Sequence, residues 1–192
     1  MNKHLLISAL LFALISGSAY AGFKEHYDLG QQYLSNYQYS GAITEFKNAL
    51  RINYLDNSAR IGLINSYMAR ATYYANTDHN YKKAADDYRS ALFYMQYYPQ
   101  TNTSGQYMPQ IIGNLNACLN QINFDKSPQN RYNTAKQLRA EGNFAAAGYE
   151  FNQALSQRDL QKDSFEQVGD IMKVLGNNPK AAEYYRKAVA VA

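Results

Sequence analysis

Two stretches in the last third of the chain decide the fold: residues 144–155 read FAAAGYEFNQAL, and residues 178–189 read NPKAAEYYRKAV. When Ala147 is aligned with Ala181, the small, aromatic and aliphatic positions of the two stretches coincide, at an interval of 34 residues. Within each stretch the apolar residues recur at steps of three and four, which places them on one face of an α-helix. The pattern therefore predicts that each stretch is one amphipathic helix of a repeated unit.

The same register continues towards the N-terminus, and each unit contains a second amphipathic helix before the aligned one. Breakers lie between the helices, as in Gly142-Asn143, and the dipeptides Ser127-Pro128 and Asn178-Pro179 are typical of helix starts. We therefore predict four pairs of antiparallel helices, over about residues 23–56, 57–98, 128–161 and 162–192.

Two intervals depart from the period. Ala42 and Ala84 are 42 residues apart, eight more than the period, and the surplus predicts that the first helix of the second pair is longer by about two turns. Ala84 and Ala147 are 63 residues apart, which leaves room for one extra helix at about residues 105–123. Its predicted inner face carries Ile111, Ile112, Leu115, Leu119 and Ile122.

This arrangement resembles the tetratricopeptide repeat (TPR) family, whose unit is a helix–turn–helix of 34 residues. The resemblance covers about residues 23–98 and 128–192. It implies an all-α fold, a right-handed solenoid of antiparallel helix pairs with about four repeats plus one extra helix. The proline that the family carries near the end of each repeat is missing here. The family's aromatic residue at the fourth repeat position is replaced by His26, Arg60, Arg131 and Phe165.

The first 21 residues have the pattern of a secretory signal peptide. Lys3 precedes an apolar run, Leu5 to Ile15, and Ala19-Tyr20-Ala21 fits the small-x-small rule before a cleavage site. The run has 11 residues, whereas a membrane-spanning helix needs about 20. We therefore expect cleavage after Ala21 and an exported product, residues 22–192, in the periplasm or outside the cell without a stable membrane anchor.

The composition bears on the class of partner. The net charge is +4, and +3 once residues 1–21 are removed, which is weak for a protein that binds nucleic acid. The sequence holds 19 Asn and 14 Gln, so binding is expected to depend on hydrogen bonds and aromatic contacts more than on a strong electrostatic field. The single cysteine, Cys118, cannot form an internal disulfide bond, and we interpret it as a small buried hydrophobe.

The sequence contains none of the motifs that indicate metal-dependent, nucleophilic or phosphate-binding catalysis. His26 and His79 fall in different repeats, and His79 stands in a predicted surface turn. Asp86 and Asp87 are adjacent on a helix and therefore point about 100° apart, which does not make an acid–base pair. We expect no enzymatic activity, no cofactor and no metal site.

In the family that the chain resembles, the first helix of each pair lines a concave groove, and this implies that the groove binds protein or peptide segments. Family members that bind a terminal carboxylate place Lys and Asn there in successive repeats, a pattern that this chain lacks. Tyr73 and Tyr74, in the lengthened part of the second pair, have no predicted packing role. The candidate partner-binding residues are Tyr27, Gln31, Asn65, Tyr73, Tyr74, Tyr132, Lys136 and Arg139.

Two alternatives to peptide binding stay open. The exposed tyrosines also suit stacking on sugars, as in an accessory protein that binds glycan or cell wall. The other alternative is the N-terminal fragment of a longer TPR protein, because the preceding helix alone cannot cover all the apolar residues of the predicted last helix. Ala182 and Val189 are among its apolar residues, so we expect either missing repeats or self-association at this end.

Overall fold

The computed structural model describes residues 20–97 and 104–192, and within these ranges all regular secondary structure is helical. The prediction of an all-α fold with helices packed in adjacent pairs is confirmed. The first helix covers residues 20–35. It is followed by α2 (Tyr39–Ile52), α3 (Asn57–Asn76), α4 (Tyr81–Tyr97), α5 (Ser104–Gln121), α6 (Pro128–Ala140), α7 (Phe144–Ala154), α8 (Arg158–Val174) and α9 (Asn178–Ala190). The predicted signal segment, residues 1–21, lies outside the described residues except for its last two positions.

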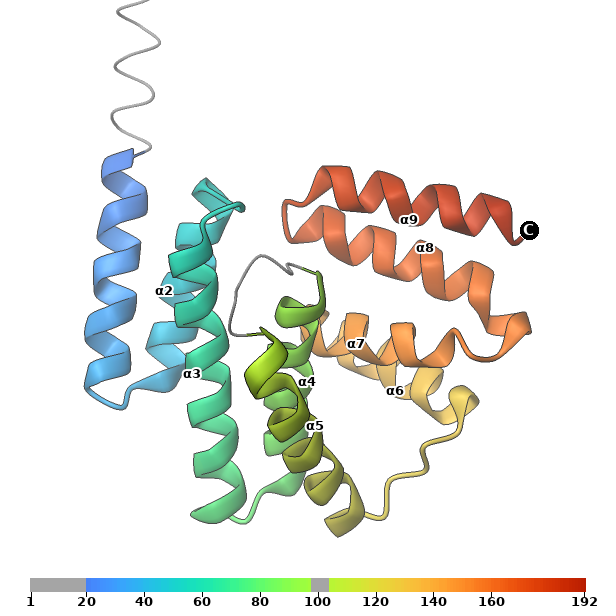
Figure 1. The fold of residues 1–192 in the computed structure, drawn as a ribbon, viewed down its shortest axis with the longest axis horizontal. Helices are drawn as coiled ribbons and strands as arrows, with labels where there is room; N and C mark the ends of the chain where they lie inside the picture. Colours follow the sequence, from blue (N-terminus) through green and yellow to red (C-terminus); the bar gives the residue numbers. More distant parts are fainter. Residues whose placement is uncertain (1–19, 98–103) are drawn as a thin grey trace, which may run out of the picture. The chain divides into compact units, whose positions relative to one another are not determined.

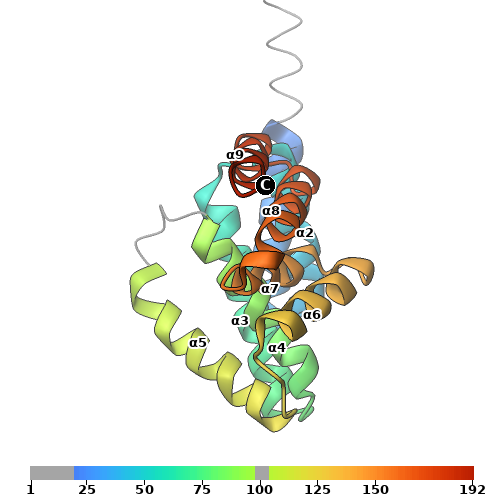
Figure 2. The ribbon, with the colours of Figure 1, turned by 90° about the vertical axis from the view of Figure 1, so that its right-hand side faces the viewer.

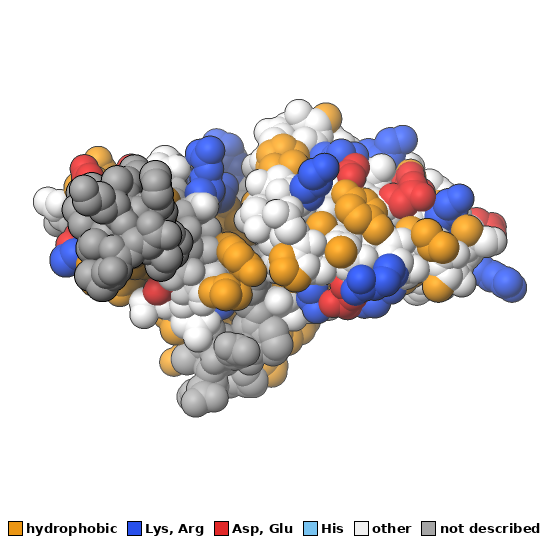
Figure 3. Space-filling view, turned by 90° about the horizontal axis from the view of Figure 1, so that it is seen from above, with side chains coloured by type: hydrophobic (Ala, Val, Ile, Leu, Met, Phe, Trp, Pro, Cys, Tyr) orange, Lys and Arg blue, Asp and Glu red, His pale blue; other side chains and the backbone are white. Residues whose placement is uncertain are grey.

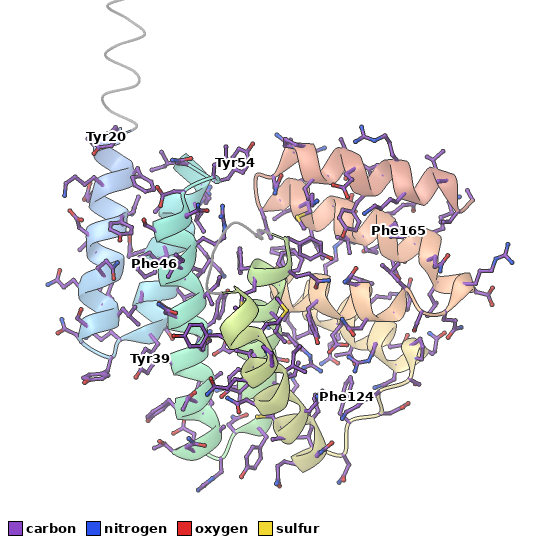
Figure 4. All side chains as sticks on the ribbon, in the orientation of Figure 1. Tyr20, Tyr39, Phe46, Tyr54, Phe124 and Phe165 are labelled. Carbon is purple, nitrogen blue, oxygen red and sulfur yellow. The ribbon has the colours of Figure 1, made fainter. Side chains whose placement is uncertain are left out.

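The chain divides into two compact units, residues 1–63 and 64–192, and the division falls inside α3. The centre of the first unit is Phe46 of α2, which is fully buried (Figure 4). A Cβ atom placed on Gly30 would lie 2.9 Å from the Phe46 ring, and one placed on Gly62 would lie 2.4 Å from it. The two glycines therefore leave the space that this ring fills between neighbouring helices.

In the second unit most helices pack against the next one along the chain. α4 packs on α5 and on α7, α6 on α7, α7 on α8, and α8 on α9. Figure 1 shows α8 and α9 lying antiparallel, and Figure 2 shows them side by side. Gly169 of α8 faces Tyr185 of α9, where an added Cβ would come within 2.6 Å of the ring. Gly169 and Tyr185 are 16 residues apart, as are Gly30 and Phe46 in the first unit. The same packing of a glycine against a large aromatic ring is therefore present in both units.

The lengthened helix and the extra helix that the two irregular intervals predict are both present. α3 has 20 residues against 13 in the corresponding α6, and α5 occupies the place of the extra helix. Ile111, Leu115 and Leu119 are buried on the inner side of α5, as predicted. Ile112 and Ile122 were assigned to that side wrongly, because both are exposed. Ile112 is one residue, or about 100°, away from Ile111, and Ile122 follows the end of the helix.

The last helix is covered along one side. Ala181, Tyr184 and Ala188 are buried, whereas Val189 is 77% exposed and Ala182 is exposed as well. Figure 3 looks down on α8 and α9, and apolar side chains there are interspersed with charged ones. Part of the apolar surface of α9 therefore faces outward as predicted, while self-association at this end stays a prediction.

Candidate binding site

A pairing position recurs between the two helices of each pair. It lies three residues after the repeat alanine, so that Ala147 is followed by Glu150 and Ala181 by Tyr184. The partner stands 19 residues earlier in three of the pairs, at His26, Arg131 and Phe165. The contacts are His26 Nδ1 with Glu45 Oε2 at 2.6 Å, Arg70 Nε with Asp87 Oδ2 at 2.7 Å, Arg131 Nη1 with Glu150 Oε2 at 2.8 Å, and the rings of Phe165 and Tyr184 with centroids 6.1 Å apart.

The pair at Glu150 is buried and includes a third residue, from α4. Glu150 is 0% exposed and Arg89 is 2% exposed. Arg89 donates from Nε to Glu150 Oε1 over 2.5 Å, while Arg131 of α6 donates to the other carboxylate oxygen. Removing a carboxylate from water costs several kcal/mol, so a buried carboxylate requires close ion pairs and hydrogen bonds that offset this cost. Two arginines on one carboxylate meet that requirement where α4, α6 and α7 come together.

The cluster continues along α4 towards solvent. Arg89 Nη1 donates to Asp86 Oδ1 over 2.8 Å, and Lys82 Nζ lies 3.4 Å from Asp86 Oδ2. Burial raises the pKa of Asp86, and the positive charges of Arg89 and Lys82 oppose that rise. Asp86 therefore lies at the boundary between the buried cluster and water, with Lys82 on its exposed side.

Phe124, in the segment between α5 and α6, packs over both arginines. The guanidinium carbon of Arg89 lies 5.0 Å from the ring centroid of Phe124, and that of Arg131 lies 5.8 Å from it. Figure 4 shows Phe124 where the segment leaves α5. Asn123 has a φ of 50°, a left-handed conformation that asparagine tolerates, and the amide of Phe124 donates to the carbonyl of Leu119 over 2.9 Å. The turn at the end of α5 thus directs the ring towards the arginines.

The start of α6 fixes the other end of this segment. Ser127 caps the helix by accepting from the amide of Asn130, and Pro128 follows at the first helical position, as predicted. The Asp125 carboxylate accepts from the hydroxyl of Ser127 over 2.7 Å and from its amide over 2.9 Å. These hydrogen bonds lower the pKa of Asp125.

A pocket of about 500 Å³ opens between α4, α6 and this segment. Arg89 Nη2 is buried and has no hydrogen-bond partner among the residues that the structure describes. The pocket is lined by Lys82, Asp86, Arg89, Ile122, Asn123, Phe124, Asp125, Asn130, Thr134, Gln137 and Leu138.

The candidate residues predicted for the groove do not line this pocket. Tyr132 and Arg139 are on the side of α6 that faces α8, where Tyr132 donates to Asp163 and Arg139 Nη2 donates to Asp170 Oδ2 over 3.0 Å. The hydrogen bond to Asp163 raises the pKa of Tyr132 to about 12. Lys136 is exposed on the same side, with its Nζ 5.6 Å from the ring centroid of Tyr132. The structure thus brings the three α6 candidates together, with two of them bonded to α8.

The other candidates occupy separate places. In the first unit, Gln31 donates to the hydroxyl of Tyr27 over 2.8 Å. Asn65 is exposed on α3, and Tyr73 and Tyr74 lie near the end of that helix with their ring centroids 6.2 Å apart. Tyr73 is 46% exposed, which leaves its ring accessible. A partner-binding role for all eight candidates stays a prediction.

Tyr97 is the last residue of α4. It is buried, with its ring 4.5 Å from that of Phe93 and 5.7 Å from that of Tyr184. Burial raises its pKa strongly. Tyr97 therefore joins the end of α4 to α9, which the repeat pattern within single pairs did not indicate.

Sequence reasoning missed the pocket and the buried cluster. The apolar pattern assigned no role to Arg89 or Glu150. A signal was nevertheless present, because an acidic residue follows the repeat alanine by three positions in three of the four pairs, at Glu45, Asp87 and Glu150.

In the described ranges, no group of three or more His, Cys, Asp or Glu side chains is arranged to hold a metal ion. In the same ranges, no helix combines the length and the apolar character needed to cross a membrane. His79 is exposed with a φ of 51°, and Cys118 is buried on α5.

Comparison with known proteins adds little to this geometry. No family model matches the chain. No curated protein matches it. Among solved structures, the crystal structure of MamA protein matches with 15% sequence identity and a TM-score of 0.34, over 88% of this chain and 91% of that one. A similarity of this degree does not support a fold assignment, so the fold is described from the helices of this chain alone.

Proposed function

We propose that this chain is an exported helical-repeat scaffold that binds protein or peptide segments. The observation that carries the proposal is the open pocket of about 500 Å³ between α4 and α6. Its volume lies within the range of about 300–1,000 Å³ that is common for ligand pockets in proteins. Its lining combines apolar side chains, amides and a few charges, which suits the mixed chemistry of a peptide.

The surroundings of the pocket support binding to a preformed surface. Arg89, which lines the pocket, is held by Glu150, and α6 is tied to α8 by Tyr132 and Arg139. Side chains that are already fixed lose little conformational entropy when a ligand arrives, so less of the interaction energy is spent on ordering.

Export is part of the proposal and rests on residues 1–21. The basic residue, the short apolar run and Ala19-Tyr20-Ala21 support a cleaved signal peptide and a periplasmic or extracellular location. N-terminal sequencing of protein recovered from the cell envelope should then begin at Gly22. Recovery of a chain that still begins at Met1 would contradict the proposed export.

Glycan binding is the second candidate, and exposed tyrosines favour it. Tyr37 is 78% exposed, Tyr73 is 46% exposed and Tyr107 is 41% exposed, so each offers a ring to a sugar. The two candidates differ in where a ligand would bind, because none of these tyrosines lines the α4–α6 pocket.

A site-specific cross-linking experiment separates the candidates. The photoreactive residue benzoylphenylalanine is placed at Gln137, at the pocket, or at Lys162, which is exposed on α8 and away from it. Each mature protein is irradiated in envelope extract, and its sedimentation with purified cell-wall polymer is measured separately. Peptide or protein adducts at Gln137 that are absent at Lys162 are the expected result. Equal labelling at both positions, or sedimentation with wall polymer without adducts at Gln137, would overturn the proposal.

A further inference from the structure

Arg89 has an unusual position for a residue with five N–H groups. Its Nε and Nη1 donate to Glu150 and Asp86, while Nη2 has no acceptor in the part of the chain that the structure describes. The side chain is 2% exposed, so bulk solvent barely reaches it. A buried polar group without a hydrogen bond is costly, and more so when it belongs to a charged side chain. A ligand oxygen that reached Nη2 would remove this cost.

The charges around Arg89 favour an anionic oxygen. The connected ion pairs contain three cations, Lys82, Arg89 and Arg131, and two carboxylates, Asp86 and Glu150. Among these five groups one positive charge is in excess, and the Asp125 carboxylate, which also lines the pocket, offsets it. Charge-assisted hydrogen bonds are roughly twice as strong as neutral ones, so a carboxylate would gain more here than an amide or a hydroxyl.

A third carboxylate, that of Asp125, also lines the pocket. It is bound to the amide and hydroxyl of Ser127 at the start of α6. Its charge repels an anion at that end of the pocket. Asp86 is paired with both Arg89 and Lys82, so an anionic group of a ligand would have to displace this carboxylate from Lys82, whose side chain is 59% exposed and free to turn from Asp86 to a ligand.

The remainder of the pocket suits apolar and amide groups. Ile122, Phe124 and Leu138 provide the apolar surface, and Asn130 and Gln137 provide amides. Because Nη2 is buried, a ligand oxygen reaches it only when the segment that carries Phe124 yields. Most residues of that segment are exposed, including Ile122 and Asn123.

We propose that the α4–α6 pocket binds a peptide carboxylate at Arg89, with Lys82 as the outer cation and Phe124 in contact with the neighbouring apolar part of the peptide. The proposal rests on peptide binding as the function of the scaffold and names the chemistry of the ligand. The carboxylate belongs to an acidic side chain or to a peptide C-terminus, and the two sources share the same recognition.

The test uses the mature chain and four libraries of pentapeptides. Two libraries fix the central residue as Glu or as Gln, with acetylated and amidated ends, and randomise the other four positions. The other two libraries fix Gln at the centre and end in a free carboxylate or an amide. The peptides retained by immobilised protein are quantified by mass spectrometry. The proposal predicts a preference of about tenfold for at least one carboxylate library over its neutral match, and the two arms show which source is used.

Three variants locate the effect. Arg89→Lys keeps a positive charge for Glu150 but removes Nη2, and Lys82→Gln removes the outer cation without a change in the buried cluster. Lys162→Gln removes one exposed charge on α8 as the matched control. The carboxylate preference should disappear in Arg89→Lys, fall several-fold in Lys82→Gln and persist in Lys162→Gln. Circular dichroism melts show whether a variant has lost the carboxylate preference because it is unfolded. If Arg89→Lys is unfolded, the result for the surface variant Lys82→Gln decides whether the site binds carboxylate.

The outcomes separate this inference from the proposed function. Retention of all libraries without a preference for carboxylate supports peptide binding and overturns the carboxylate site. A preference that all three variants retain places the carboxylate elsewhere and also overturns the inference. Retention of none of the libraries contradicts peptide binding itself.

Discussion

The α6–α7 pair and the α8–α9 pair follow the same 34-residue register, yet they bury different chemistry at one shared position. In the first pair this position is Glu150, opposite Arg131, and in the second it is Tyr184, opposite Phe165. An aromatic pair needs only close neighbours, and Tyr97 provides one more. A buried carboxylate needs a donor for each oxygen, and this requirement is met by Arg89 of α4. The 34-residue register therefore determines where the two helices of a pair make this contact. The residue types at that position determine whether a further helix, such as α4, also contributes a side chain to it.

The largest effect is expected when the charged contact is broken. Glu150→Leu leaves Arg89 and Arg131 without their shared carboxylate, and the loss of one partner of a buried ion pair costs about 3–5 kcal/mol. The free energy of unfolding, measured by urea titration, should fall by that amount. Glu183→Gln, which removes a half-exposed carboxylate from α9, should cost less than about 1 kcal/mol. Equal costs for the two variants would contradict the burial of Glu150.

Breaking the aromatic contact should have the next largest effect. Tyr184→Ala removes a buried ring that packs on Phe165 and Tyr97, and a truncation of this kind costs about 3 kcal/mol. Tyr184→Phe keeps the ring and should cost much less. If both variants melt at the same temperature, the ring does not contribute the packing assigned to it.

A smaller effect is expected at the alanines that define the register. Ala147 and Ala181 are 0% and 3% exposed, so Leu at either position should overpack the contact and cost about 1–3 kcal/mol. Lys136→Leu and Lys173→Leu, at exposed positions of α6 and α8, are the matched controls and should change stability little. Thermal melts in which the lysine sites are the sensitive ones would show that the register is wrong.

The helix pairs could be predicted because they depend on apolar spacing. The 34-residue interval from Ala147 to Ala181 aligns the small and the large positions of successive pairs. The two intervals that exceed this period predicted the longer α3 and the extra helix α5. Spacing within one pair could not predict contacts between pairs. Arg89 reaches Glu150 across 61 positions of the chain, and Tyr97 meets Tyr184 across 87 (184 − 97). The pocket depends on such contacts between pairs and on the direction of the Phe124 side chain, which is set by the turn at the end of α5. The apolar pattern therefore could not predict the pocket.

The smallest expected effects concern pH, and they have opposite signs in the two regions. Burial raises the pKa of Asp86 above its ordinary value of 3.8, so the folded state holds that proton more tightly and stability falls as the pH rises through the interval just above 3.8. Hydrogen bonds from Lys180 and Lys187 lower the pKa of Glu183 below its ordinary value of 4.5, so its contribution is present above 4.5 and is lost as the pH falls through the lowered pKa.

Stability measured between about pH 3 and about pH 6 in the two variants separates these terms. Asp86→Asn should remove the decrease with rising pH, and Glu183→Gln should remove the loss on the acid side. Added salt should weaken the Glu183 effect more, because that residue is closer to solvent. The same change of slope in both variants would contradict the opposite environments assigned to the two carboxyl groups.

A pair of double-mutant cycles tests most directly whether the two helix pairs share one contact position with different chemistry. One cycle combines Arg131→Met with Glu150→Met, the other combines Phe165→Ala with Tyr184→Ala, and unfolding free energies are measured at low and high salt. A favourable coupling energy of about 1 kcal/mol or more is expected in both cycles. Any dependence of the coupling energy on salt is expected only in the cycle of Arg131 and Glu150. Additive effects in either cycle would show that its two residues are not in contact, and the common position 19 residues apart would be contradicted.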